Sequence, residues 1–311
     1  MISTFFRDIA RSVSRFAGSL PPVLLAVPNV SEGRDRAVLE AIEGAFAPAR
    51  FLDLHADADH NRSVFTLAAP QGELSRGLLN GARAVVERVD LRKHEGLHPR
   101  VGALDVMPVV YLSEEQRGAA CAELLSAAGL IGGELEVPVI LYGELATRPE
   151  NRERAALREG GREVLAERIE SGELAPDFGP PRPHPTAGVT LAAARPPLIA
   201  FNLDLASDDV ELARRIAAEI RESGGGLPGV RAIGLYLEQR GCAQVSTNVH
   251  DFRATPLRDV VDAVRDRAEV VEAELVGLAP EAAFRDFPED VPIRGFSPER
   301  HLLENALRSL Q

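Results

Sequence analysis

The stretch RFLDLHADADHNRSVFTLAA, residues 50–69, decides the fold of the first half of the chain. Its two apolar and β-branched runs, 50–56 and 62–69, are separated by the Asp-, Asn- and His-rich segment 57–61, which is typical of a β-hairpin. A strand and a helix capped by Ser31 are predicted before this hairpin, and a helix and a strand after it. These segments are strand 23–30, helix 36–47, helix 73–90 and strand 100–112. The predicted order is therefore β-α-β-β-α-β.

The middle of the chain adds elements and then changes in character. A helix over 113–130, a strand over 137–145 and a charged helix over 149–170 are predicted. Residues 173–188, ELAPDFGPPRPHPTAG, are rich in proline and glycine, which interrupt helices and sheets. We interpret this segment as an ordered loop close to a domain boundary.

The second half of the chain repeats the order of the first. The predicted segments are strand 196–205, helix 208–223, a hairpin of residues 229–239 and 242–252, helix 257–270 and strand 271–280. Two such units in one chain suggest an internal duplication.

The predicted fold class is α+β, with two ferredoxin-like (split-βαβ) α/β sandwich subdomains and a ligand cleft between them. The predicted divisions are an N-terminal extension, 1–22, an N-terminal subdomain, 23–190, and a C-terminal subdomain, 191–311. In the extension, Arg7, Arg11 and Arg15 recur at helical spacing, which predicts a short basic amphipathic helix.

Composition and charge exclude several classes of protein. The 311 residues carry a formal net charge of −12, which argues against nucleic-acid binding but not against a small anionic ligand held by a few arginines. The sequence has no apolar run of about 18 residues, so no membrane span is predicted. Its two cysteines, Cys121 and Cys242, are far apart, as expected of reduced thiols in a cytoplasmic protein.

The string HEGLH, residues 94–98, matches the H-E-x-x-H pattern of zinc peptidases. That pattern requires both histidines on one helical face, but Pro99 disfavours helical conformation at His98, and Gly96 lies between the two histidines. We therefore predict no metal site, and we interpret His94 and Glu95 as incidental loop residues. A histidine in a polar loop can instead serve as a general base near neutral pH.

Several blocks of the sequence together resemble the formiminotransferase domain family. They cover most of residues 23–305 in the same order as in that family. The blocks are VPNVSEG (27–33), HNRSVFT (60–66), HEGLHPRVGALDVMP (94–108), VPVILYGELA (137–146), APDFGP (175–180), LIAFNLDL (198–205), VRAIGLYLEQRGCAQVSTNVHDF (230–252) and FSPERHLLE (296–304). The resemblance includes no cyclodeaminase domain.

The resemblance implies an enzyme of histidine degradation and one-carbon metabolism. It implies transfer of a formimino group from N-formimino-L-glutamate to tetrahydrofolate, a co-substrate, giving 5-formiminotetrahydrofolate and L-glutamate. His98 of the G-x-H-P-R string is implied as the general acid/base. Two alternatives stay open: glutamate formyl transfer with 5-formyltetrahydrofolate, and a folate-binding protein without activity.

Further site residues follow from the matched blocks. Arg62 and Arg100 are candidates for binding substrate carboxylates, and His55 and Asn61 are further candidates for substrate binding. The implied folate contacts lie in two Gly-rich segments: Gly179, Pro180, Pro181, Arg182, Pro183, His184, Pro185, Thr186, Ala187 and Gly188, and then Gly225, Gly226, Leu227, Pro228, Gly229, Val230, Arg231, Ala232, Ile233 and Gly234.

The sequence departs from the mammalian family pattern in the first hairpin. An aspartate thought to partner the catalytic histidine is replaced by His55, so the proton relay uses His55 itself or one of Asp53, Asp57 and Asp59. The resemblance further implies a homodimer and, as a second partner, a separate cyclodeaminase. No nucleic acid and no membrane are expected as partners.

Overall fold

The computed structural model of the protein describes residues 23–96 and 99–310, which form two compact units. The first unit is Val23–Pro197, and the second begins at Leu198. The amphipathic helix predicted within residues 1–22 lies outside the described residues, as does His98. Among the described residues, no helix is long and apolar enough to cross a membrane.

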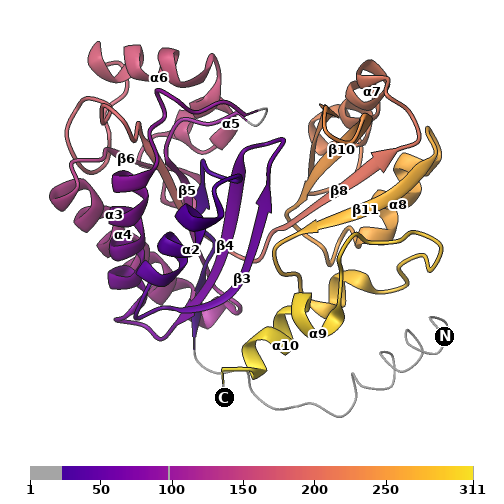
Figure 1. Ribbon diagram of the computed structural model, residues 1–311, viewed down its shortest axis with the longest axis horizontal. Coiled ribbons are helices and arrows are strands. Elements are labelled where there is room, and N and C mark those ends of the chain that lie inside the picture. The colour runs from indigo at the N-terminus through magenta and orange to yellow at the C-terminus, as the bar shows by residue number, and fades with distance from the viewer. Residues whose placement is uncertain (1–22, 97–98, 311) are drawn as a thin grey trace. The chain divides into compact units, whose positions relative to one another are not determined.

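The first unit is built on a seven-stranded sheet (Figure 1). The strands occur across the sheet in the order β3, β4, then β1 and β2, then β5, β7 and β6. Both β1 and β2 pair with β4 and β5, because Pro28 interrupts what would otherwise be one strand. The strands are β1 (Leu24–Ala26), β2 (Asn29–Val30), β3 (Arg50–Asp57), β4 (Arg62–Ala69), β5 (Leu104–Val110), β6 (Val139–Leu141) and β7 (Thr190–Arg195).

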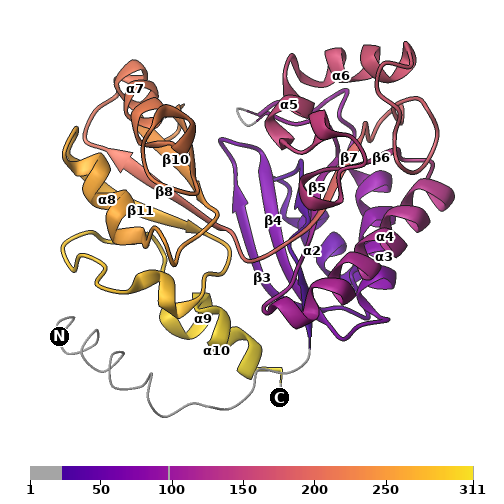
Figure 2. The ribbon, with the colours of Figure 1, turned by 180° about the vertical axis from the view of Figure 1, so that it is seen from behind.

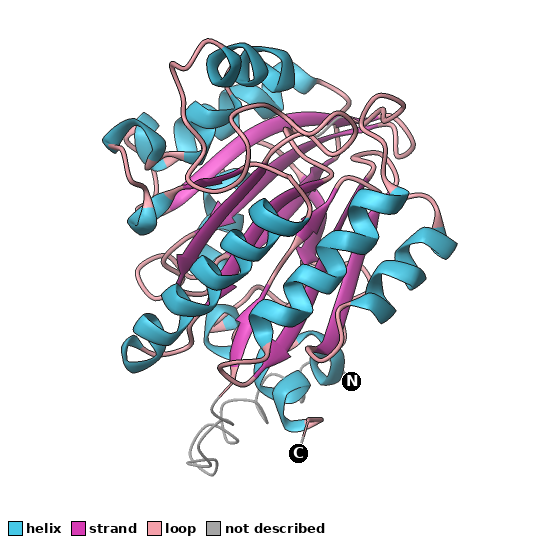
Figure 3. Cartoon of the chain, turned by 90° about the vertical axis from the view of Figure 1, so that its left-hand side faces the viewer, coloured by secondary structure: helices cyan, strands magenta, loops and turns pink. Residues whose placement is uncertain are grey.

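Helices cover both faces of this sheet. On one face, α2, α3 and α4 bury apolar residues such as Ile42, Leu78 and Leu124 against the strands, and Figure 3 shows helices lying across it. On the other face, a smaller core includes Leu157 of α5 and Ile169 of α6, and Figure 2 shows these two helices at one end of the unit. The helices are α2 (Arg36–Ala45), α3 (Leu74–Arg88), α4 (Arg117–Glu134), α5 (Arg154–Arg158) and α6 (Gly161–Glu170).

The second unit has a four-stranded antiparallel sheet in the order β11, β8, β10, β9. Apolar residues of α7 and α8, including Ile216 and Val261, form its core with Phe201 and Val245 of the strands. The elements are β8 (Ile199–Leu205), α7 (Val210–Ile220), β9 (Val230–Leu237), β10 (Cys242–Val249), α8 (Leu257–Arg265), β11 (Val270–Val276), α9 (Pro298–His301) and α10 (Leu303–Arg308).

The structure confirms the β-α-β-β-α-β order in both halves, and therefore the α+β class. Three details of the prediction are wrong. The helix expected over 149–170 is interrupted, because Gly160 and Gly161 both adopt positive φ, +74° and +78°. Strand β7 was not predicted, and it pairs in parallel with β5 and β6. The cap of α2 is Asp35 rather than Ser31, whose hydroxyl donates to the Gly102 carbonyl at 2.8 Å.

Candidate functional site

The polar loop between α3 and β5 packs on the tip of the β3–β4 hairpin. At that tip, Asn61 adopts a left-handed φ of 45°, and its side chain bonds to two other segments. Its Nδ2 donates to the Glu95 carbonyl at 2.8 Å, and its Oδ1 accepts from the Gly33 amide at 2.9 Å. Asn61 therefore ties the hairpin tip both to the loop and to the segment that follows β2.

His94 reinforces the same contact. Its Nε2 lies 2.8 Å from the Asn61 carbonyl oxygen, which can only accept, so Nε2 carries a proton. Burial lowers the pKa of His94, and the charge of Arg100 adds to this shift, so the ring is neutral at pH 7. The interpretation of His94 as an incidental loop residue is therefore wrong. The described residues contain no group of three or more His, Cys, Asp or Glu side chains that could hold a metal ion.

Gly96 is required by the closeness of this packing. A Cβ atom added at Gly96 would lie 2.4 Å from the His60 carbonyl oxygen, well inside van der Waals contact. Arg100, which follows residues 97–98, bonds back to the residues before them. Its Nη1 donates to the Gly96 carbonyl at 3.0 Å, and its Nη2 donates to the His94 carbonyl at 2.8 Å. The segments before and after residues 97–98 are thus bonded to each other.

The end of the first predicted folate segment lies beside this loop. The Ala103 amide donates to the Ala187 carbonyl at 2.8 Å, and the Val189 amide donates to the Val101 carbonyl at 3.0 Å. Gly188 has a φ of +68°, and a Cβ there would lie 2.3 Å from the Val101 carbonyl oxygen. The segment that precedes β7 therefore docks directly on the residues that follow Arg100.

His184 shapes the turn at that end of the folate segment. Its amide and carbonyl exchange hydrogen bonds with those of Gly188, at 2.9 Å each, and its Nδ1 accepts from the Ala187 amide at 3.0 Å. Burial lowers the pKa of His184, so this acceptor is available at neutral pH. At the segment's other end, Gly179 has a φ of +82° and packs close to the backbone of Val137.

The second predicted folate segment lies in the second unit. Gly225 and Gly229 both adopt positive φ. A Cβ at Gly234 would lie 2.3 Å from the Arg214 amide nitrogen, so this glycine lets α7 pack closely on β9. In β9, Val230 and Ala232 are buried in the core while Ile233 is exposed.

The predicted relay residues lie on and after β3. His55 is half-buried and pairs with Val64 of β4. Asp53, Asp57 and Asp59 are all buried, and Asp57 Oδ1 accepts from the His60 amide at 2.8 Å.

Asp105 is the centre of a buried ion-pair group at the start of β5. Its side chain is fully buried, and its Oδ2 accepts from Arg62 Nη1 at 2.7 Å and also from Arg158 Nη2. Its Oδ1 accepts from the Val101 amide at 2.8 Å. Burial alone would raise the pKa of Asp105, but the Arg158 and Arg62 guanidinium groups together lower it below its usual value. The second Arg62 nitrogen, Nη2, donates to Asn29 Oδ1 at 2.6 Å.

Two further arginines extend this group. The Arg154 guanidinium lies over the Tyr142 ring, 6.0 Å from its centroid, and its charge helps to lower the pKa of Arg62, Arg158 and Arg195. Burial is the main cause of each shift, and the pKa values of Arg158 and Arg195 are both about 10. We call Arg62, Arg154, Arg158 and Arg195, together with Asp105, the arginine cluster. Except for Arg62, its arginines were not predicted; the i, i+4 spacing of Arg154 and Arg158 was the available signal.

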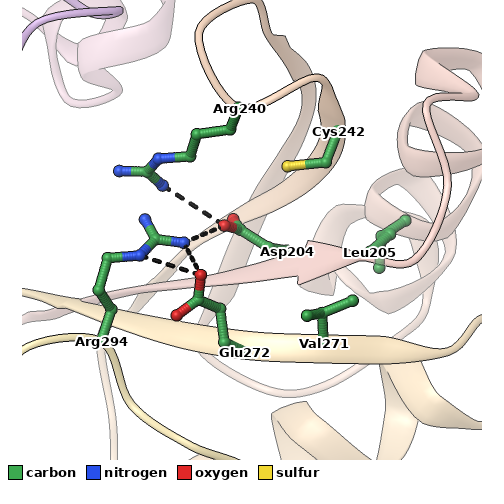
Figure 4. A pocket seen from close by; sticks show the side chains of 7 residues that line it. All are labelled: Asp204, Leu205, Arg240, Cys242, Val271, Glu272 and Arg294. Carbon is green, nitrogen blue, oxygen red and sulfur yellow. Dashed lines mark hydrogen bonds and ion pairs between the residues drawn. The ribbon is translucent and has the colours of Figure 1, made fainter.

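The second unit contains a charged cavity of about 370 Å³ beside β8 and β11 (Figure 4). Arg294 Nε donates to Glu272 at 3.1 Å, and its Nη2 bonds to both Glu272 and Asp204. Arg240 lies 3.4 Å from Asp204 and 3.2 Å from Glu274. We call these three carboxylates and two arginines the carboxylate cluster. Cys242 also lines this cavity, and burial raises its pKa, so its thiol is not an activated nucleophile.

Comparisons with known proteins cover both units. The family profile described as formiminotransferase domain, N-terminal subdomain, matches residues 23–195, and that of the formiminotransferase domain matches residues 200–288. The chain is 38% identical over 298 residues to a glutamate formimidoyltransferase of Streptococcus pyogenes serotype M1, which covers 92% of this chain and 98% of that protein.

Two further relatives differ in how much of their own length is matched. A glutamate formimidoyltransferase of Thermoplasma acidophilum is 36% identical over 293 residues, covering 90% of this chain and 96% of that protein. A formimidoyltransferase-cyclodeaminase of Gallus gallus is 42% identical over 280 residues, covering 85% of this chain and 51% of that protein.

Proposed function

We propose that this chain, which belongs to the formiminotransferase domain family, transfers a formimino group from N-formimino-L-glutamate to tetrahydrofolate. The observation that carries the proposal is the match to a glutamate formimidoyltransferase over 98% of that protein's length. Because the matched ranges include the polar loop of the first unit and the β9–β10 hairpin of the second, they cover the residues proposed for the catalytic, substrate and folate contacts.

The chemistry requires proton transfer more than a nucleophilic side chain. Nitrogen-5 of tetrahydrofolate attacks the amidine carbon of the donor, and a tetrahedral intermediate forms. The attacking nitrogen then loses a proton, and the glutamate nitrogen gains one as it leaves. We propose His98 as the group that moves this proton, since an imidazole has a suitable pKa. In support, His94, Gly96 and Arg100 bond the loop on both sides of residues 97–98.

We propose different roles for the other candidate residues. Asn61 and Arg100 donate to loop carbonyls, which favours a role in positioning the loop over direct substrate binding. Arg62, held by Asp105 and Asn29, remains a candidate for a substrate carboxylate. His55 remains the proposed relay partner, with Asp53, Asp57 and Asp59 as the alternatives. Folate is proposed to contact residues 179–188 and 225–234.

The fold supports a more specific description of the two units. In each, the helix-linked strands occur across the sheet in the ferredoxin-like order, β3-β4-β1/β2-β5 in the first and β9-β10-β8-β11 in the second. We therefore propose two ferredoxin-like units, the first extended by β7 and β6. We also propose a homodimer, and a separate cyclodeaminase as a partner, the latter because a relative named formimidoyltransferase-cyclodeaminase is matched over 51% of its length.

An assay of the purified protein tests the function directly. With N-formimino-L-glutamate and tetrahydrofolate, the protein should release L-glutamate, and His98→Ala should reduce that rate by about 100-fold or more. A wild-type protein that releases no L-glutamate contradicts the proposed transfer. Consumption of L-glutamate with 5-formyltetrahydrofolate as donor would instead support the formyltransferase alternative.

His94→Ala is the matched control for this assay. It removes a histidine from the same loop but leaves the proposed acid/base group, so we expect a reduced rate with an unchanged pH profile. If His98→Ala retains the full rate, the role assigned to His98 is wrong.

A further inference from the structure

We infer that Arg154 and Arg158 form a subsite that binds the carboxylate of a glutamate moiety. The inference rests on the proposed function, in which both the formimino donor and the folate tail carry glutamate. It names two arginines of α5 as substrate-binding residues, and neither belongs to the polar loop or to the two folate segments.

The charge around Asp105 is the first reason. Its Oδ2 is shared by Arg62 and Arg158, and its Oδ1 is occupied by the Val101 amide. Neither Arg154 nor Arg195 forms a salt bridge with a described residue. Arg158 is buried beside Arg62 and Arg154, and burial together with these two positive charges lowers its pKa to about 10. An additional anion would relieve this repulsion.

The second reason is the set of donors that the arginines leave available. Among the described residues, the buried Nε of Arg158 has no hydrogen-bond partner, although its Nη2 is bonded to Asp105. The Arg154 guanidinium contacts the face of Tyr142 and has no hydrogen-bond acceptor in the described part of the chain. A buried donor without an acceptor is costly, whereas an arginine binds a carboxylate through two parallel hydrogen bonds.

The third reason is geometry. Arg154 and Arg158 are four residues apart on α5, so their side chains lie on the same face of the helix. Asp105 connects this face to the start of β5, and Arg162 Nη1 connects the next helix to the Leu91 carbonyl at 2.9 Å. Arg158 is therefore bonded, through Asp105, to the end of the segment that contains the polar loop, and the helix that follows α5 is bonded to its beginning.

The charged cavity of the second unit does not offer the same chemistry. Both of its guanidinium groups already bind carboxylates, and carboxylates outnumber arginines there. A substrate carboxylate would be repelled at that cavity. The arginine cluster is therefore the better anion-binding group of the two.

Steady-state kinetics with three variants test the subsite. Arg154→Met removes one guanidinium, Arg158→Lys keeps the charge but not the bidentate geometry, and Arg152→Met removes an exposed arginine two residues from Arg154 as the matched control. We expect the first two to raise the KM of a glutamate-bearing substrate by about tenfold or more, with kcat changed by less than about threefold, and the control to change neither.

The substrate affected identifies the source of the carboxylate. A higher KM for N-formimino-L-glutamate assigns the subsite to the donor, and a higher KM for tetrahydrofolate assigns it to the folate tail. Unchanged KM values for both substrates in both variants would overturn the inference while leaving the proposed transfer intact.

Calorimetric titration separates the subsite from the activity. Wild-type protein and Arg154→Met are titrated with L-glutamate and with 5-formyltetrahydrofolate, neither of which requires turnover. Weaker binding of either ligand to Arg154→Met supports the subsite even if the wild-type protein shows no transfer. Equal binding of both ligands to the two proteins counts against it.

Discussion

The two units bury charge in opposite proportions. In the arginine cluster of the first unit, one carboxylate is shared by Arg62 and Arg158, and the pKa values of these arginines are lowered, mainly by burial. In the carboxylate cluster of the second unit, burial also lowers the pKa of Arg294, but bonds to Glu272 and Asp204 outweigh it and raise that pKa overall. A cluster with an excess of positive charge is suited to bind an anionic ligand, whereas a cluster in which carboxylates outnumber the arginines serves mainly to hold the fold together.

Removing the shared carboxylate should have the largest effect. Asp105→Asn leaves Arg62 and Arg158 buried beside each other without a counter-charge, so we expect a loss of about 3 kcal/mol or more in the free energy of unfolding. Asp204→Asn should cost only about 1 kcal/mol, because Glu272 and Glu274 still neutralise the arginines. Thermal unfolding by calorimetry measures both, and equal losses would contradict the contrast between the clusters.

Removing an arginine from the carboxylate cluster should have an intermediate effect. Arg294→Met leaves three carboxylates with Arg240 alone, and we expect destabilisation by about 2 kcal/mol because charge-assisted hydrogen bonds to two carboxylates are lost. Denaturant unfolding gives the change. Stability equal to that of the wild-type protein would mean that this cluster contributes nothing to holding the second unit together.

The equivalent substitution in the first unit should have a small effect of opposite sign. Arg154→Met removes a charge that repels Arg158 and Arg195, so the ligand-free protein should become more stable, by about 0.5 kcal/mol. The melting temperature, compared with that of Arg152→Met, checks this. A clear destabilisation would show that Arg154 is a structural residue rather than a binding residue.

Protonation of His94 should have the smallest effect. Because its pKa is lowered in the folded protein, mainly by burial and partly by Arg100 and Arg34, folding favours the neutral ring. That contribution is present above the unfolded pKa of about 6.5 and is lost as the pH falls through the lower folded pKa. Since the ring is only half-buried, we expect less than about 0.5 kcal/mol between pH 7 and pH 5.5. His94→Gln should lack this pH-dependent difference.

The sequence predicted the strongly patterned elements and missed those that depend on tertiary contacts. The β3–β4 hairpin and helix α3 have clear periodicity and were predicted within a few residues. Strand β7, which is largely alanine, has low intrinsic strand propensity and is fixed by its parallel pairing with β5 and β6. The helix predicted over 149–170 failed at Gly160, where positive φ overrides the charged periodic pattern.

The same limit applies to the candidate site. The block HEGLHPRVGALDV indicated an important loop, but not that His94 would hold that loop against Asn61, a contact between residues 33 positions apart. Arg154 and Arg158 fell within the charged helix predicted over 149–170. The role that we propose for them depends on Asp105, which lies 53 residues away from Arg158 and is buried only because the sheet forms around it.

The antiparallel contact between residues 101–103 and 187–189 has a consequence for how the first unit opens. The Ala103 and Val189 amides each donate across it, so neither hydrogen can exchange with solvent while the two segments stay together. Both amides should therefore be protected from deuterium exchange to the same degree, because a single opening event exposes both. A folate analogue bound to residues 179–188 would slow that exchange at Ala103 as well, and so report on the polar loop from a position outside it.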